Sequence, residues 1–145
     1  MIDTHSISLK TIVKEFDLQV VHAATDFDSV RITVEDISRP GIQLSGYFDH
    51  FDPVRLQVMG NVEMSYLARL DELERGRILD RLFSYKFPAL LITRNIAPGP
   101  ICVEMAKKHN VTLLRSSLPT STITSAIISH LKAELSRTFL LCPHA

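Results

Sequence analysis

The second half of the chain alternates between short apolar runs and amphipathic segments, and this alternation restricts the fold more than any other feature. The run 89–93 carries no charged residue, which is typical of a strand buried on both faces of a sheet. A helical pattern follows over 98–110, with Asn110 as its expected end, and a second apolar run occupies 111–114. A last helix, capped by Thr120 or Ser121, places apolar residues every fourth position from 123 to 135. This order predicts an α/β layered domain with a mixed sheet.

The first half of the chain contributes shorter elements of the same kinds. Ser8 is expected to cap a first helix. Alternation of apolar and polar residues predicts half-buried strands at 30–34 and 55–60. A helical segment covers 67–83, with a break near Asp71, because Asp71 and the glutamate three residues later have the spacing of a capping box. Its expected buried positions are Leu67, Leu70, Leu73, Leu79, Leu82 and Phe83.

The composition favours one soluble domain. The chain has 145 residues and no formal net charge, which argues against strong binding to nucleic acid or to an anionic membrane surface. Cys102 and Cys142 form no CxxC motif, so we expect no disulfide and a reducing compartment. The first residues do not form a signal peptide, and no apolar run approaches the roughly 20 residues that span a bilayer. We therefore expect a cytoplasmic protein.

Motifs for nucleotide, metal or nucleophile chemistry are absent from the sequence. None of the five glycines precedes a lysine, which excludes a P-loop, and GxGxxG does not occur. The six histidines have no paired spacing that would indicate a metal site, and no GxSxG supports a serine nucleophile. We assign no catalytic, cofactor-binding or metal-binding residue.

Three arginines are candidate anion-binding residues, two at predicted strand ends and one beside a predicted turn. Arg94 follows one buried strand and Arg115 ends another, at the edge where open α/β sheets bind ligands. Guanidinium groups there could hold a phosphate or a carboxylate. Arg39 precedes the Pro-Gly pair at 40–41 and is the third candidate. The structural alternative is that Arg39 pairs with a local carboxylate such as Asp36, and that the other two neutralise a helix C-terminus or a surface acid.

The segment 36–51 combines turn-forming and aromatic residues. Proline followed by glycine at 40–41 predicts a type II turn, in which the glycine has positive φ. The aromatic side chains that follow are too apolar to remain in water, so they face either the core or a subunit interface. The candidate interface residues are Tyr47, Phe48 and Phe51.

Several blocks of the sequence occur in a familiar order. They are DISRPGIQLSGYFD at 36–49, RLQVMG at 55–60, EMSYL at 63–67, PALLITR at 88–94 and LLRSS at 113–117. In this order they resemble the N-terminal domain of HPr kinase/phosphorylase, the bacterial HPr serine kinase. The resemblance covers roughly residues 6–138, and Arg137-Thr138 lies where that family connects to its second domain.

The resemblance implies a fold and an enzyme family. The implied fold is a three-layer α/β sandwich with a mixed sheet over residues 1–138, similar also to the N-terminal domains of Mur ligases. The family phosphorylates a serine of the phosphocarrier HPr with ATP or pyrophosphate, and removes that phosphate with inorganic phosphate. It thereby links the phosphotransferase system to carbon catabolite repression, and its members are hexamers. Its ATP and Mg²⁺ sites belong to a P-loop domain with no counterpart in these residues, and 139–145 depart from the family pattern.

Two functional hypotheses follow. The first is a non-catalytic assembly and regulatory domain, inactive alone and without a cofactor, that forms a homo-oligomer or docks on a catalytic domain. It would meet HPr only through the full-length enzyme, with no nucleic-acid or membrane partner. The second is a stand-alone domain that senses an anionic small molecule. The chain would be an isolated domain, a truncated product or a stand-alone relative.

Overall fold

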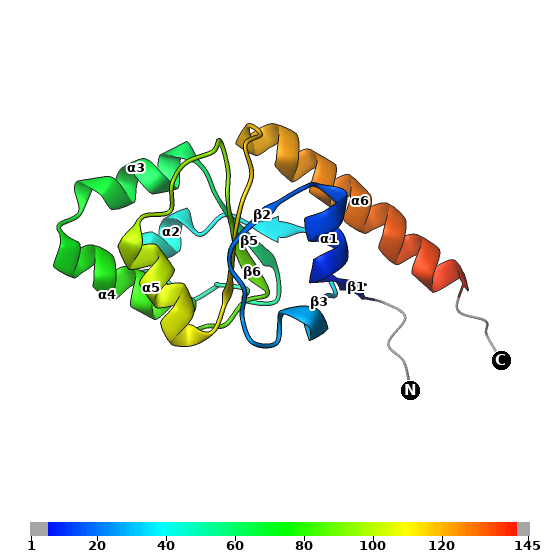
Figure 1. Cartoon of the computed structure of the whole chain (residues 1–145), viewed down its shortest axis with the longest axis horizontal. Helices are drawn as coiled ribbons and strands as arrows, with labels where there is room; N and C mark the ends of the chain where they lie inside the picture. Colours follow the sequence, from blue (N-terminus) through cyan, green and yellow to red (C-terminus); the bar gives the residue numbers. More distant parts are fainter. Residues whose placement is uncertain (1–5, 142–145) are drawn as a thin grey trace.

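A mixed sheet between two helical layers forms the centre of the molecule (Figure 1). The computed structural model describes residues 6–141, with side chains described as far as Arg137. Across these residues the main sheet has five strands in the order β2 (Gln19–His22), β7 (Thr112–Arg115), β6 (Ala89–Ile92), β5 (Leu56–Met59) and β4 (Ile37–Ser38). Strands β4 to β7 are parallel, and β2 is antiparallel to β7. The predicted three-layer α/β sandwich with a mixed sheet is confirmed.

The helices that link the parallel strands share one face of the sheet (Figure 1). Strands β4 to β7 follow one another in sheet order, so right-handed crossovers place each connection on the same side. These helices are α2 (Gly41–Leu44), α3 (Asn61–Arg69), α4 (Glu72–Phe83) and α5 (Pro100–His109). The other face is covered by α1 (Leu9–Glu15), α6 (Thr120–Leu141) and a two-stranded ribbon of β1 (Ile7–Ser8) and β3 (Arg31–Ile32). A short 3-10 helix, Phe27–Ser29, precedes β3.

Adjacent residues of the central strands serve two separate cores. In β6, Leu91 packs in the core beneath α1 and α6, whereas Leu90 packs beneath α3, α4 and α5. All four residues of β5 are buried, although its alternating pattern predicts one wet face. The amide nitrogen of its polar member, Gln57, donates to the carbonyls of Asp52 and Arg55 at 3.2 and 2.9 Å, whereas Gln57 Oε1 is buried without a partner among the described residues.

Side-chain caps define two helix starts, as the sequence predicted. Ser8 Oγ accepts the Thr11 N–H at 3.0 Å at the start of α1. Asp71 Oδ1 accepts the Glu74 N–H at 2.8 Å, and this cap separates α3 from α4. The predicted break at Asp71 is confirmed.

The ends of α5 and α6 follow different rules. Asn110 ends α5 in a left-handed conformation, with φ of 57°, as expected for its C-terminal stop. Helix α6 begins at Thr120, and the Pro119 carbonyl accepts the Ile123 N–H at 3.1 Å. Thr120 is therefore in the first turn rather than at the cap.

Three local predictions are wrong. Residues 40–41 form no type II turn, because Gly41 begins α2 and the Pro40 carbonyl accepts the Leu44 N–H at 3.1 Å. Leu73, predicted to be buried, is 64% exposed. Of the predicted strand 30–34, only β3 pairs with another strand.

Within residues 6–141, no helix is both long and apolar enough to cross a membrane. Cys102 is a free, buried thiol. Two segments lie outside the described residues: 1–5, and 142–145. The second contains Cys142 and belongs to the predicted divergent tail.

Candidate functional site

Arg39 and Glu63 form a two-point ion pair at the carboxyl ends of β4 and β5. Arg39 Nε donates to Glu63 Oε2 at 3.2 Å, and Nη2 donates to Oε1 at 2.7 Å. The Glu63 side chain is 6% exposed, whereas that of Arg39 is 40% exposed. The predicted structural alternative for Arg39 named Asp36, but Asp36 pairs with Arg55 at 3.4 Å. Sequence analysis did not single out Glu63 as a partner.

Glu63 also closes the start of α3. Its Oε1 accepts the N–H of Gly60 at 2.8 Å, as the glutamate of a capping box does. Burial raises the pKa of the Glu63 carboxyl. Several contacts lower it and outweigh burial: the hydrogen bond from Arg39, those from the N–H groups of Gly60 and Glu63, and the Arg39 charge. The net pKa lies below the ordinary value of 4.5. Glu63 is therefore ionised at neutral pH and balances the charge of Arg39.

Gly60 lies where three chain segments meet. A Cβ at this position would lie 2.3 Å from Thr120 Oγ1 and 3.3 Å from Arg39 Nη2. Thr120 Oγ1 is 2.6 Å from Thr93 Oγ1, and the Thr93 N–H donates to the Met59 carbonyl at 3.1 Å. The ends of β5 and β6 are thus joined to the first turn of α6. Sequence analysis did not identify this junction, although the Gly60-x-x-Glu63 spacing, with a glutamate at the third helical position, could have indicated the capped start of α3.

Arg94 lies beside the first turn of α6. Its N–H donates to the Leu118 carbonyl at 2.8 Å, and the Asn95 N–H donates to the Ser116 carbonyl at 2.8 Å. Arg94 and Asn95 both have left-handed backbones, with φ of 59° and 56°. The Arg94 side chain is exposed, and among the described residues it has no hydrogen-bond or ion-pair partner. Its guanidinium is therefore available to a ligand.

Arg39 and Arg94 line one open depression of about 570 Å³. The remaining lining residues come from the starts of α3 and α6, and all but Val62 have polar side chains: Asn61, Val62, Thr120, Ser121, Thr124 and Ser125. Thr124 Oγ1 is shielded from solvent and has no hydrogen-bond partner in the described part of the chain. Two of the three candidate arginines therefore meet at the predicted sheet edge.

Arg115, the third candidate, does not line this depression. Its Nη2 donates to the Asn95 carbonyl at 2.5 Å, and its Nε is buried without a partner among the described residues. It braces the connection that carries Arg94, which makes it a positioning residue in this arrangement.

The candidate interface residues occupy three different environments. Phe48 is 6% exposed and stacks on Tyr85 with ring centroids 5.1 Å apart. Phe51 is half-buried and meets the Tyr85 ring edge-on at 5.0 Å. Tyr47 is 47% exposed, and Ile42 on α2 is 63% exposed. The exposed apolar surface of this segment therefore comes from Ile42 and Tyr47, and Phe48 belongs to the core.

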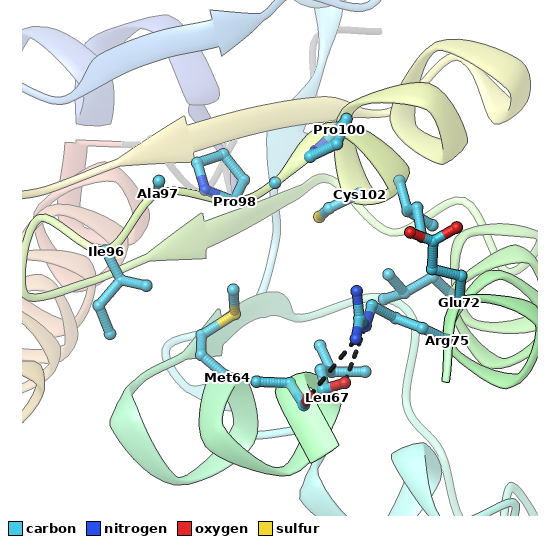
Figure 2. A pocket seen from close by; sticks show the side chains of 13 residues that line it. Met64, Leu67, Glu72, Arg75, Ile96, Ala97, Pro98, Pro100 and Cys102 are labelled. Carbon is cyan, nitrogen blue, oxygen red and sulfur yellow. Dashed lines mark hydrogen bonds between the residues drawn. The ribbon is translucent and has the colours of Figure 1, made fainter. Parts of the chain in front are cut away.

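A second, apolar cavity of about 400 Å³ lies between α3, the start of α4 and the connection from β6 to α5 (Figure 2). Met64 and Leu67 reach it from α3, and Ile96 and Pro98 reach it from the opposite side. Its polar side chains are few, so it offers shape and apolar area rather than reactive chemistry.

Two side chains of this cavity with polar or reactive groups, Arg75 and Cys102, are not available for chemistry. Arg75 Nε donates to the Leu67 carbonyl at 2.8 Å (Figure 2). Its Nη2 donates to the Leu70 carbonyl at 2.7 Å, so Arg75 satisfies carbonyls at the end of α3. Burial raises the pKa of the Cys102 thiol to about 12, so it is not a thiolate at neutral pH. In the described part of the chain, no three His, Cys, Asp or Glu side chains are grouped so as to hold a metal ion.

Comparison with known proteins agrees with this fold. A family model described as "HPr Serine kinase N terminus" matches residues 7–131. The chain belongs to this family. The match with the HPr serine kinase N-terminal family covers the main sheet, the positions of Arg39, Glu63 and Arg94, and the first half of α6.

Curated relatives of this HPr serine kinase N-terminal domain are much longer. HPr kinase/phosphorylase of Streptococcus pyogenes serotype M1 is 36% identical over 130 residues, which cover 90% of this chain and 42% of the relative. The protein of the same name from Peptoclostridium acidaminophilum is 35% identical over 135 residues, covering 93% and 44%. The chain spans about two fifths of the length of these relatives.

A solved structure shares the fold of this HPr serine kinase N-terminal domain. It contains the CBS and DRTGG domains of the regulatory region of Clostridium perfringens pyrophosphatase, complexed with its activator diadenosine tetraphosphate. The TM-score is 0.59 at 17% identity, and the match covers 83% of this chain and 46% of the other. At this identity the likeness describes the fold alone.

Proposed function

We propose that this chain acts as the non-catalytic assembly and regulatory domain of an HPr kinase/phosphorylase. The family match over residues 7–131 carries the proposal, together with the names of the curated relatives. Phosphoryl transfer needs a phosphate cradle and metal-holding carboxylates, and the sequence contains no P-loop. In this proposal ATP and Mg²⁺ bind elsewhere, HPr is met through the full-length enzyme, and the setting is the cytoplasm.

The proposed assembly surface is the exposed apolar part of the 41–47 segment. Ile42 and Tyr47 present apolar area to solvent, while the neighbouring Leu44 and Phe48 are buried and hold the segment in place. A fixed segment loses little conformational freedom when a partner covers it, which favours association. The occupant we propose is a second copy of this chain or the catalytic domain of the same enzyme.

Sedimentation velocity over a range of concentrations tests the assembly. We expect the wild-type chain to form a dimer or larger oligomer, and Ile42→Asp and Tyr47→Asp to shift it to monomer, because a charge in an apolar interface is desolvated without a partner. Leu73→Asp is the matched control, because Leu73 is equally exposed but lies on α4. A wild-type chain that stays monomeric and does not bind a separately produced catalytic domain would exclude this surface as an assembly site.

An activity assay tests the non-catalytic part. The chain alone is mixed with HPr and with either ATP and Mg²⁺ or pyrophosphate. We expect no phosphoserine on HPr by mass spectrometry, whereas a full-length relative under the same conditions phosphorylates it. Phosphorylation by this chain alone would overturn the proposal.

A further inference from the structure

The depression lined by Arg39 and Arg94 has the charge and donors of an oxyanion site. We propose that it binds a phosphate group, carried by inorganic phosphate or by a small phosphorylated metabolite. The proposal does not depend on the assembly role above, because it rests on the side chains of the depression alone. The two arginines come from the ends of β4 and β6, so the fold, rather than a flexible loop, brings them together.

The charge balance of the depression is positive. Glu63 neutralises Arg39, and among the residues that the structure describes no carboxylate lines the depression to neutralise Arg94. The first turn of α6 adds N–H groups, and in the described part of the chain no side chain accepts a hydrogen bond from them. A helix of 22 residues contributes roughly half a positive charge at this end. Together these features favour a ligand with one to two negative charges.

The available donors suit a tetrahedral ligand better than a planar one. Glu63 engages Nε and Nη2 of Arg39, which leaves Nη1 free for a ligand. Four hydroxyl side chains line the depression on the α6 side: Thr120, Ser121, Thr124 and Ser125. The Thr120 hydroxyl is already hydrogen-bonded to Thr93, which leaves the other three as candidate donors. Phosphate oxygens accept several such hydrogen bonds in different directions. Val62 is the main apolar lining residue, and none of the described lining residues is aromatic. A nucleobase would therefore find no ring on which to stack.

The frame around the arginines is fixed before any ligand arrives. The Arg39 guanidinium is held at two points by a buried carboxylate. The backbone of Arg94 is tied to Leu118, and the next residue is tied to both Ser116 and Arg115. Preorganised donors lose little entropy on binding.

The test is an NMR titration of the isotope-labelled chain with inorganic phosphate, and separately with a hexose 6-phosphate, at constant ionic strength. We expect saturable shifts of the amides of Asn61, Arg94 and Ser121. Equal affinity for the two ligands indicates inorganic phosphate, and tighter binding of the sugar phosphate indicates a metabolite. The absence of saturable shifts with either ligand at about 20 mM would overturn the proposal, since such an affinity would be too weak to matter in a cell.

Two variants separate a specific site from general electrostatics. Arg94→Asn should weaken binding about tenfold through loss of a charge-assisted hydrogen bond, and asparagine tolerates the left-handed backbone. Ser121→Asp should abolish binding while leaving the fold intact, because a carboxylate stabilises a helix start but repels phosphate. Arg77→Asn removes the same charge from an exposed position on α4 and should leave binding unchanged. Equal weakening by Arg77→Asn would overturn the proposal.

Discussion

Gly60 is the position in the candidate site that least tolerates an added side chain. Its φ of −116° is open to any residue, so the constraint is steric: a Cβ added here would lie only 2.3 Å from Thr120 Oγ1. We expect Gly60→Ala to lower the free energy of unfolding by about 1–3 kcal/mol, because the start of α6 must move away. Urea denaturation followed by circular dichroism measures this.

A second glycine provides the control for Gly60. Gly76 lies inside α4, and a Cβ there would meet nothing within 4 Å. Gly76→Ala should therefore stabilise the chain by roughly 0.5–1 kcal/mol, since alanine is the better helix former. If both variants changed stability in the same direction, the contact with Thr120 would not be the cause.

The pH dependence of stability should carry the signature of Glu63. Because its pKa is lower in the folded state than its ordinary value of 4.5, its ionised form stabilises the fold. This contribution is fully present above pH 4.5 and is lost as the pH falls through the lowered pKa. We expect Glu63→Gln to be less stable than wild type by about 1–3 kcal/mol at pH 7, and the gap to shrink below pH 4.5.

Comparison of wild type with Glu63→Gln separates the contribution of Glu63 from those of the other carboxyl groups. Asp80 also has a lowered pKa, through hydrogen bonds from His109 and Lys108, but it is present in both proteins and cancels in the difference. Urea unfolding at several pH values between 3 and 7 gives the gap at each pH. A gap that stays constant over this range would mean that Glu63 acts through packing rather than through its charge.

At the scale of elements, the Asp71 cap helps to fix the corner between α3 and α4, beside the Arg75 bonds to the end of α3. Asp71 satisfies the N–H of Glu74, and the chain bends at Leu70 before it. We expect Asp71→Ala to lower stability by about 1 kcal/mol, whereas the exposed neighbour change Glu72→Ala should have a smaller effect. Thermal unfolding of both variants measures the difference, and equal effects would show that the cap contributes nothing specific.

Elements with local signals could be predicted from the sequence, and elements decided by tertiary packing could not. The apolar runs of β6 and β7 and the caps at Ser8 and Asp71 all appear in the structure. The Pro-Gly pair at 40–41 fits a turn or a helix start equally well. Burial of Leu44 beside α3 and α4 decides for the helix.

Leu73 shows how one bend changes a whole pattern. Treating 67–83 as a nearly continuous helix places Leu73 on the same stripe as Leu67 and Leu70. The bend before Asp71 resets the phase, so α4 buries Leu79, Leu82 and Phe83, as predicted, while Leu73 faces solvent. The bend itself was predicted, but its angle depends on packing against the sheet and cannot be read from spacing.

The candidate site was predictable in outline only. The rule that ligands meet the carboxyl ends of parallel strands selected Arg94 and Arg115, and Arg39 was selected because it precedes a Pro-Gly pair. In the structure Arg39 and Arg94 line one depression, which Arg115 does not line. The partner of Arg39 depends on the β4–β5 register, which brings Glu63 rather than Asp36 to the guanidinium. Arg115 is the last residue of β7, and its guanidinium donates to the Asn95 carbonyl instead of facing the depression, a contact that strand position alone does not predict.

At the scale of the whole molecule, a single sheet couples two cores. Leu90 and Leu91 are neighbours in β6, but each belongs to a different core, and both are fully buried. Loss of either core exposes one face of the same strands, so neither layer of helices can remain folded by itself. We therefore expect the domain to unfold as one cooperative unit.

The positions of the tyrosines make this cooperativity measurable. All three, Tyr47, Tyr66 and Tyr85, lie on or beside α2, α3 and α4, and the chain has no tryptophan. Tyrosine fluorescence therefore reports one helical layer, while far-ultraviolet circular dichroism reports both. We expect Leu90→Ala and Leu91→Ala each to lower stability by about 2–5 kcal/mol, with coincident urea transitions by the two methods. If Leu91→Ala shifted the dichroism but left the fluorescence transition in place, the two cores would unfold independently and the single-sheet coupling would be wrong.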